Sequence, residues 1–236
     1  MENLPAYISI VFILTTLLSA GLFYKAAHYS KAVLFILMCW LMIQALVAWA
    51  GFYTNTAGLP PRFILLIVPP LLAIGILFFT AKGHLFIDHL NIRTLTILHM
   101  VRIPVELVLY WLFLQKAVPG LMTFEGRNFD ILSGLTAPFI WYFGFIKKVL
   151  SGKIILAWNI VCLGLLLNIV LNALLSAPFT FQQFGFEQPD IAITYFPFTW
   201  LPSVIVPFVL FSHLAVIRKL WKADLRMPAP KDIAVA

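Results

Sequence analysis

The segment TLTILHMVRIPVELVLYWLFLQ, from Thr94 to Gln115, is the apolar stretch of this chain that carries charge deep inside it. At a rise of about 1.5 Å per residue, about twenty residues cross the hydrocarbon core of a bilayer, so the segment is long enough to span it as a helix. A lone charge at the centre of a bilayer is unfavourable by roughly 3 to 10 kcal/mol. The charged side chains are therefore expected to face protein or trapped water, which makes this segment the candidate site.

Four polar residues of the segment share one face of the expected helix. His99, Arg102, Glu106 and Tyr110 are spaced three, four and four residues apart, and such spacing aligns side chains along a helix. Arg102 and Glu106 can also pair with each other. Pro104 lies between them, removes one backbone hydrogen bond and crowds the preceding turn, so it predicts a kink where the charges lie.

The composition is that of an integral membrane protein. Of the 236 residues, 62% are hydrophobic and 11% are charged, and the mean hydropathy is +0.99. Soluble domains carry about 25% charged residues. The net charge of +7 does not indicate nucleic-acid binding, because the basic residues lie in short loops and in a tail rather than along a stripe of a soluble domain.

Seven apolar stretches predict an all-α, polytopic seven-helix bundle. They cover residues 4–24, 32–53, 63–80, 94–116, 129–147, 154–175 and 199–221. No soluble domain fits between them, so we expect a single transmembrane domain over residues 1–222 and a tail over residues 223–236. Adjacent prolines in the third stretch, Pro69 and Pro70, are expected to break or bend that helix.

Basic residues alternate between the loops in a pattern that predicts the orientation. One side of the membrane would carry Lys25, Lys31, Lys82, Arg93, Lys147, Lys148, Lys153, Arg218, Lys219, Lys222, Arg226 and Lys231. The other side would carry only Arg62, Lys116 and Arg127. Because cytoplasmic loops are enriched in Lys and Arg, the pattern predicts a bacterial cytoplasmic-membrane protein with its N-terminus outside and its C-terminus inside.

Further polar residues are candidates for the same site. Gln44 lies near the middle of the second stretch, and Asn168 and Asn172 lie four residues apart in the sixth, where amides need hydrogen-bond partners. The block PGLMTFEGRNFDILSGLTAP places a polar group at the outer surface: Glu125, Asn128 and Asp130. Asn128 is also a candidate N-cap of the fifth helix. The long loop from Ser176 to Phe198 is either a lid over the outer mouth or a set of aromatics resting in the membrane interface.

These residues favour a polar cavity inside the membrane that binds a small anionic or amphipathic ligand for transport or sensing. Arg102 would hold the anionic group and Glu106 would titrate with its binding or movement. Membrane lipid is the other expected partner, and the pattern predicts no particular oligomeric state. No cofactor is favoured.

Two alternatives of other classes stay open. One is a membrane-embedded, metal-dependent enzyme acting on lipid through histidines near the cytoplasmic side: His84, His89, His99 and His213. A weaker variant pairs His99 and His213 as axial ligands of a haem. The other alternative is a structural or accessory subunit, in which the buried ion pair only holds the helices together.

The combination of Arg102, Pro104 and Glu106, followed by the block TFEGRNFD from Thr123 to Asp130, resembles a group of small multi-pass membrane proteins of bacteria. The resemblance covers roughly residues 99 to 138 and implies no activity. It implies that the charged helix and the segment from Glu125 to Asp130 belong together, as opposite ends of one cavity.

Overall fold

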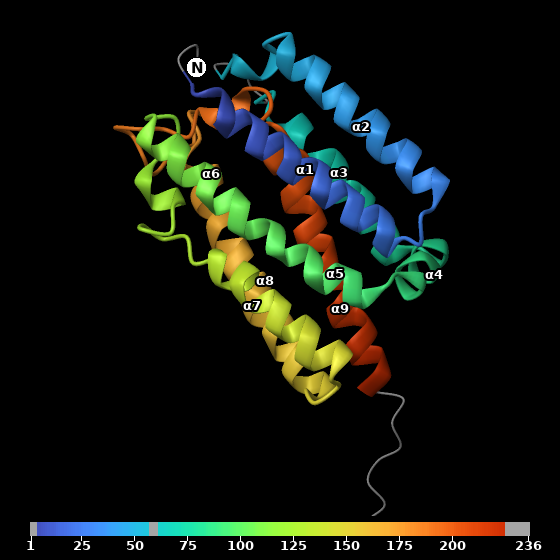
Figure 1. Ribbon diagram of the computed structural model, residues 1–236. Helices are drawn as coiled ribbons and strands as arrows, with labels where there is room; N and C mark the ends of the chain where they lie inside the picture. The colour runs from blue at the N-terminus through green and yellow to red at the C-terminus, as the bar shows by residue number, and fades with distance from the viewer. Residues whose placement is uncertain (1–3, 57–60, 225–236) are drawn as a thin grey trace, which may run out of the picture.

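Every regular element of this protein is helical in the part that the computed structural model describes, residues 4–56 and 61–224 (Figure 1). The α-helices are α1 (Ala6–Ala26), α2 (Lys31–Trp49), α3 (Ile64–Phe79), α4 (Ala81–His89), α5 (Ile92–Leu98), α6 (Arg102–Leu114), α7 (Ile131–Phe139), α8 (Gly152–Ser176) and α9 (Val206–Asp224). Short 3-10 turns are η1 (Phe52–Thr54), η2 (His99–Val101), η3 (Gly120–Met122) and η5 (Ala192–Thr194), and π-helical turns are η4 (Ile140–Ile146) and η6 (Leu201–Ile205).

The helices are those of a membrane protein. Within the described residues, five are long and apolar enough to cross a membrane: α1, α2, the combined α5–η2–α6, α8 and η6–α9. The number rises to six if α3 and α4, which are bent by 94° against each other, form one span. A shorter apolar helix covers Ile131–Ile146. Helices thus occupy each of the seven apolar stretches in the sequence.

The charged segment contains a short change in helix type. The α-helical pattern gives way to the 3-10 turn η2 over His99–Val101, and α6 begins at Arg102. Pro104 lies in the first turn of α6, and a proline ring crowds the carbonyl four residues earlier, which here is that of Met100 inside η2. An irregular turn thus lies beside the charged residues, and the kink expected from Pro104 stays a prediction.

The expected break at Pro69 and Pro70 does not occur there. Both prolines lie inside α3, which continues to Phe79. The sharp turn comes at Thr80, whose backbone is extended and whose side-chain oxygen accepts a hydrogen bond from the Gly83 N–H at 3.1 Å, capping α4. α3 therefore ends at the extended residue Thr80, ten residues beyond the proline pair.

The last helix runs through the middle of the bundle. η6–α9 packs against α8, α5, α3 and α1, whereas α2 lies at the margin with most of its side chains exposed (Figure 1). At its C-terminal end, α9 is tied to α4 by Asp88, whose carboxylate pairs with Arg218 at 2.8 Å and with Lys222 at 2.7 Å. The predicted tail begins inside α9, and residues 225–236 lie outside the described residues.

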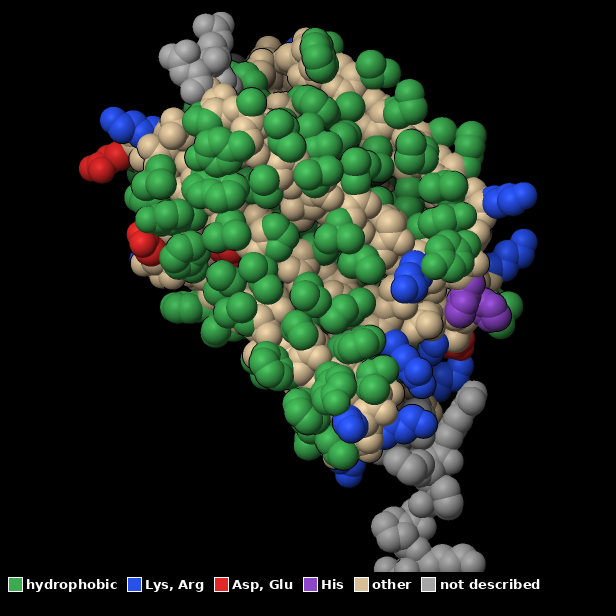
Figure 2. Space-filling view, viewed as in Figure 1, with side chains coloured by type: hydrophobic (Ala, Val, Ile, Leu, Met, Phe, Trp, Pro, Cys, Tyr) green, Lys and Arg blue, Asp and Glu red, His purple; other side chains and the backbone are tan. Residues whose placement is uncertain are grey.

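The surface has an apolar middle and polar ends. Figure 2 shows hydrophobic side chains over most of one face, with Lys and Arg gathered at the end where α9 finishes. The loop between α8 and η6 lies at the opposite end and is fastened to the bundle. Its Gln188 side-chain amide donates to the carbonyls of Phe113 at 3.0 Å and Val118 at 2.6 Å, and the Ala117 carbonyl accepts from the Ala192 N–H at 3.1 Å. This loop therefore covers the end of α6.

Candidate functional site

Arg102 and Glu106 lie one turn apart on α6, and both side chains are turned into the protein. Each is only 2% exposed. Both line a cavity that lies between α6, α8, η6–α9 and the N-terminal half of α3. The sequence-based expectation that these two residues form the centre of a buried polar site agrees with this placement.

The main partner of Arg102 is Asp130 rather than Glu106. One terminal nitrogen of Arg102, Nη1, donates to Asp130 Oδ1 at 2.7 Å, and this is the ion pair of the guanidinium in the described structure. The expected pairing of Arg102 with Glu106 is therefore corrected. Asp130 comes close because α7 approaches α6 at Gly134, where a Cβ atom would lie 2.9 Å from Ile103 Cγ1. A larger residue would force the two helices apart.

The second terminal nitrogen of Arg102 is also occupied. Nη2 lies 2.9 Å from His213 Nε2, and His213 Nδ1 lies 2.9 Å from Asn159 Oδ1. Because a guanidinium only donates, Nε2 must accept, so His213 is neutral with its proton on Nδ1, which donates to Asn159. The Asn159 amide nitrogen donates to the Ile155 carbonyl at 2.8 Å. Arg102, Asp130, His213 and Asn159, which we call the arginine network, thus join α6, α7, α9 and α8.

His99 belongs beside the arginine network rather than in the cavity. Its ring stacks on that of His213, with ring centroids 3.9 Å apart and planes inclined by 15°. Trp158 packs beside both rings, with centroid distances of 5.6 Å to His99 and 5.9 Å to His213. His99 does not line the cavity, and its ring nitrogens have no partner within the described residues. Its role here is to pack against His213.

Glu106 is held on one side only. Its Oε1 accepts a hydrogen bond from the Asn128 amide, which also donates to the Met122 carbonyl at 3.0 Å. The Asn128 side-chain oxygen accepts from the Asp130 N–H at 3.0 Å, so the amide orientation is fixed. Asn128 thus orients Glu106 and does not cap α7, whose N-cap position is Asp130. Glu106 Oε2 is buried and has no hydrogen-bond partner in the described structure.

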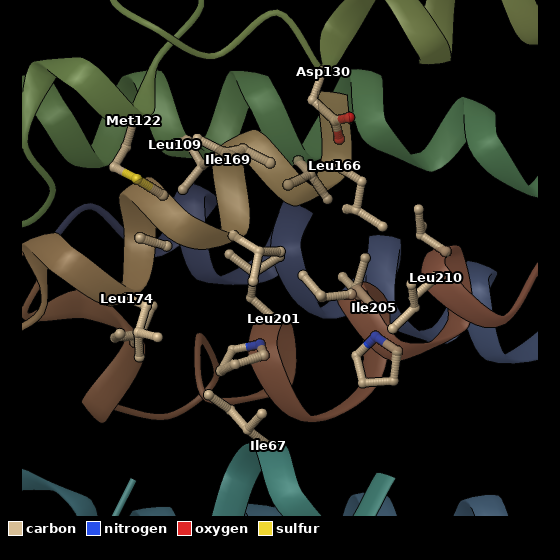
Figure 3. Close-up of a pocket in the computed structure, with 18 of the residues that line it drawn as sticks. Ile67, Leu109, Met122, Asp130, Leu166, Ile169, Leu174, Leu201, Ile205 and Leu210 are labelled. Atoms are coloured by element: carbon tan, nitrogen blue, oxygen red, sulfur yellow. The ribbon is translucent and has the colours of Figure 1, made fainter. Parts of the chain in front are cut away.

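The cavity beside these groups has a volume of about 290 Å³ and mainly apolar walls. Figure 3 shows Asp130 at one margin and Ile67 of α3 at the opposite one, with Leu166 and Ile205 between them. Four ionisable side chains line it: Arg102, Glu106, Asp130 and Asp190. Three of the four are acidic.

Asp190 is the cavity residue that the sequence did not single out. It lies in the loop between α8 and η6, is fully buried, and is held in place by its backbone N–H, which donates to the Ser176 carbonyl at 2.9 Å. The Ile193 N–H points toward the carboxylate, but neither oxygen completes a hydrogen bond of normal geometry. Burial raises the pKa of Asp190 to about 7, against the opposing effect of the Ile193 N–H. The sequence offered little to distinguish it from Glu187, the other acid of this aromatic-rich loop, three residues earlier.

The cavity opens sideways, between α3 and α8. Leu71 of α3 and Leu167 of α8 both line it and are 42% and 48% exposed on the surface of the bundle. The other lining side chains are buried or half-buried. α3 packs against η6 and α9, and α8 packs against α9. The cavity is therefore bordered by exposed apolar side chains on this side of the bundle.

Comparisons with known proteins add no assignment. No protein-family model, curated protein or solved structure matches this chain.

The structure places five other predicted site residues away from the cavity. Gln44 accepts a hydrogen bond from the Tyr53 hydroxyl at 2.6 Å. The Tyr110 ring packs against Phe124, with a centroid distance of 5.0 Å. Asn168 donates to the Arg127 carbonyl at 2.9 Å, and Asn172 donates to the Asn168 carbonyl at 2.9 Å. Glu125 is exposed on the loop. These local partners satisfy the amides without Arg102 or Glu106.

The four histidines proposed as metal ligands do not form one site. A ring nitrogen of His84 lies 2.6 Å from the Phe78 carbonyl, His89 lies beside the ring of His28, and His99 and His213 stack inside the bundle. Within the described residues, no group of three or more His, Cys, Asp or Glu side chains is arranged to hold a metal ion. The expectation that these four histidines share one metal site is therefore corrected, because their side chains contact different parts of the fold.

Proposed function

We propose that this protein spans a bacterial cytoplasmic membrane seven times and binds a small amphipathic molecule, for transport or sensing, in the cavity beside α6. The observation that carries the proposal is the combination found there. Apolar walls surround buried carboxyl oxygens that have no hydrogen-bond partner within the described residues, namely Glu106 Oε2 and both oxygens of Asp190. The cavity opens toward the surface that would face lipid. Such pockets, mainly apolar with a few convergent polar groups, are typical ligand sites.

The seven-span topology follows if α3 with α4 and α7 with η4 each cross once, in addition to the five longer helices. The N-terminus would then lie outside. Support comes from the basic side chains at the end where α9 finishes, as expected for a cytoplasmic surface (Figure 2). The cavity lies in the outer half of the bundle in this orientation, because its lining residues come from the start of α3, the end of α8 and the start of η6–α9.

Selectivity in this site would come from the polar end of the ligand. Moving an alkyl chain from the bilayer into an apolar protein cavity changes its surroundings little, because lipid tails are as apolar as leucine side chains. Hydrogen bonds and charge at Glu106 and Asp190 therefore discriminate between ligands. Leu71 and Leu167, at the opening, would let the chain of a longer ligand extend into the lipid.

A pair of matched substitutions on α8 tests the proposal. Ala173 lines the cavity, whereas Leu171 is 58% exposed and does not. Ala173→Phe would fill the cavity, and Leu171→Phe would add similar bulk on the outer surface. Native mass spectrometry of protein extracted in its own lipids should show a bound small molecule in the wild type and in Leu171→Phe, and its loss in Ala173→Phe. If wild type and Ala173→Phe retain the same molecules in the same amounts, the cavity is not the binding site.

A further inference from the structure

The charges around the cavity do not balance. Arg102 is the cation, and its charge is compensated by Asp130 at 2.7 Å. The neutral His213 occupies the other terminal nitrogen. Of the guanidinium only Nε is left without a partner. Two of the three guanidinium nitrogens are thus already hydrogen-bonded, so Arg102 offers little to an anionic ligand. That Arg102 holds an anionic group stays a prediction.

Two carboxyl groups are left over. Glu106 has only the neutral amide of Asn128 on Oε1, and Oε2 is free of partners. Asp190 has no side-chain partner, since both of its oxygens lack a completed hydrogen bond. A carboxylate taken out of water needs either a proton or a cationic partner, because an isolated buried charge is strongly unfavourable. The described residues place no second cation along the cavity wall.

The geometry points to a ligand that supplies this missing cation: a primary ammonium group on an apolar chain, with the ammonium donating to Glu106 Oε2 and the chain lying among Leu166, Ile205 and Ile67. This inference rests on the proposed function, since it names the ligand class of the same cavity. An ammonium carries three donors and no acceptor, which suits a site whose free atoms are carboxyl oxygens. Asp190 would add negative potential at the outer end of the cavity.

The fixed position of Glu106 favours this role. The Asn128 amide is anchored by the Asp130 N–H and the Met122 carbonyl, so it holds the Glu106 carboxyl group in one orientation. Oε2 is thus presented without further rearrangement, and such preorganisation lowers the entropic cost of binding. A hydrogen bond between charged partners contributes about 1.5 to 3 kcal/mol, which is roughly a tenfold to hundredfold change in affinity.

Three probes with the same alkyl chain separate the possibilities: dodecylamine, dodecanol and dodecanoate. Binding would be measured by isothermal titration to the full-length protein in phosphatidylcholine nanodiscs, with empty nanodiscs correcting for partition into lipid. We expect dodecylamine to bind about tenfold or more tightly than dodecanol, and dodecanoate to bind least. Glu106→Gln keeps the shape and the contact with Asn128 but removes the charge, so it should abolish the preference for the amine. Glu125→Gln, which changes an exposed acid of the same outer region, should not.

Each outcome bears on a different statement. If dodecylamine and dodecanol bind equally and Ala173→Phe weakens both, the cavity binds ligand but the ammonium inference is overturned. If dodecanoate binds best, Arg102 rather than Glu106 selects the ligand, and the inference is again overturned. If no probe binds and native mass spectrometry finds no molecule, the proposed function itself fails.

One further arm identifies the source of the ammonium group. Nanodiscs made with phosphatidylethanolamine present a lipid that carries a primary amine. Weaker dodecylamine binding in these nanodiscs would support the inference with the lipid head group as the natural ligand. Unchanged binding would support it with a free amphipathic amine.

Discussion

Arg102 and Glu106 are neighbours on the same face of α6 and equally buried, but their surroundings differ. In the arginine network both terminal nitrogens of Arg102 are paired, Nε alone lacks a partner within the described residues, and the Nδ1–H of His213 donates to Asn159 Oδ1. Glu106 is paired through one oxygen and open through the other. Buried polar networks stabilise a fold when they are satisfied, whereas an incomplete one is unfavourable unless a ligand completes it. We therefore expect substitutions at Arg102 to affect mainly stability and substitutions at Glu106 to affect mainly the proposed binding.

The site therefore has two halves, the arginine network and the cavity side of Glu106, and each half matches one of two functional alternatives. Arg102 and Asp130 match the alternative in which a buried ion pair only joins helices. They link α6 to α7 and, through His213, to α9. A ligand site describes the cavity side of Glu106. Substitutions should separate these roles, with large effects on unfolding at Arg102 and small ones at Glu106.

The largest loss of stability is expected for Arg102→Met. The substitution keeps a long side chain but leaves Asp130 and His213 buried without their partner, and breaking a buried ion pair destabilises by about 3 to 5 kcal/mol. Thermal unfolding in nanodiscs should show a large decrease in the midpoint. Arg127→Met, at an exposed arginine of the outer loop, is the control and should change it little.

A double substitution distinguishes lost pairing from lost packing. Adding Asp130→Leu to Arg102→Met removes the stranded carboxylate, and apolar replacement of both partners is often neutral or stabilising. We expect the double variant to recover much of the stability that Arg102→Met loses. An Arg102→Met protein as stable as the wild type would contradict the division between the two halves of the site.

Asp190 should give an intermediate effect that depends on pH. Its pKa is raised by burial to about 7, above the value of about 3.9 in an unfolded chain. The folded state therefore binds the proton more tightly, so the stability from this group is complete below about pH 4 and is lost as pH rises to about 7, by roughly 1.4 kcal/mol per pH unit. Above pH 7 its contribution no longer changes.

Asp190→Asn isolates this contribution. The variant should be less sensitive than the wild type to a rise from pH 4 to pH 7, measured by thermal unfolding in nanodiscs. Glu187→Gln, at an exposed acid three residues away, should follow the wild-type profile. Parallel profiles for wild type and Asp190→Asn would show that the buried carboxyl does not titrate in this range.

The sequence predicted those features of the site that depend on local pattern. The positions of the helices follow from apolar runs, and the burial of Arg102 and Glu106 follows from the unfavourable energy of charge in a bilayer. Each of these depends on residues within one or two turns of each other.

The sequence grouped Asn128 and Asp130 with the charged helix, but it did not predict which partner from a distant segment each charged side chain contacts. Asp130 and His213 lie 28 and 111 residues from Arg102, and only the packing of α7 and α9 against α6 brings them together. Asn159 lies on the same helix as Asn168 and Asn172 but was not among the predicted site residues. Spacing along one helix shows which residues share a face but not what that face contacts. Gln44 accepts its hydrogen bond from Tyr53, nine residues further along the chain. An amide inside an apolar helix therefore need not belong to the central site.

The smallest effect on stability is expected for Glu106→Gln. The amide oxygen of glutamine can still accept from Asn128, and the substitution adds no volume. We expect a change in unfolding free energy below about 1 kcal/mol, as for other substitutions that keep shape and hydrogen bonding. Thermal unfolding without added ligand should therefore resemble that of the wild type.

Adding dodecylamine turns the same variant into the sharpest test of the comparison. A ligand that binds only the folded state raises stability by RT ln(1 + [L]/Kd), so a concentration of about one hundred times Kd adds about 2.7 kcal/mol. The wild type should gain this stabilisation and Glu106→Gln should gain little, although the two begin nearly equal. Arg102→Lys, which keeps the charge near Asp130, should start less stable than both but still respond to the amine. A Glu106→Gln protein that responds fully would remove Glu106 from the binding half of the site.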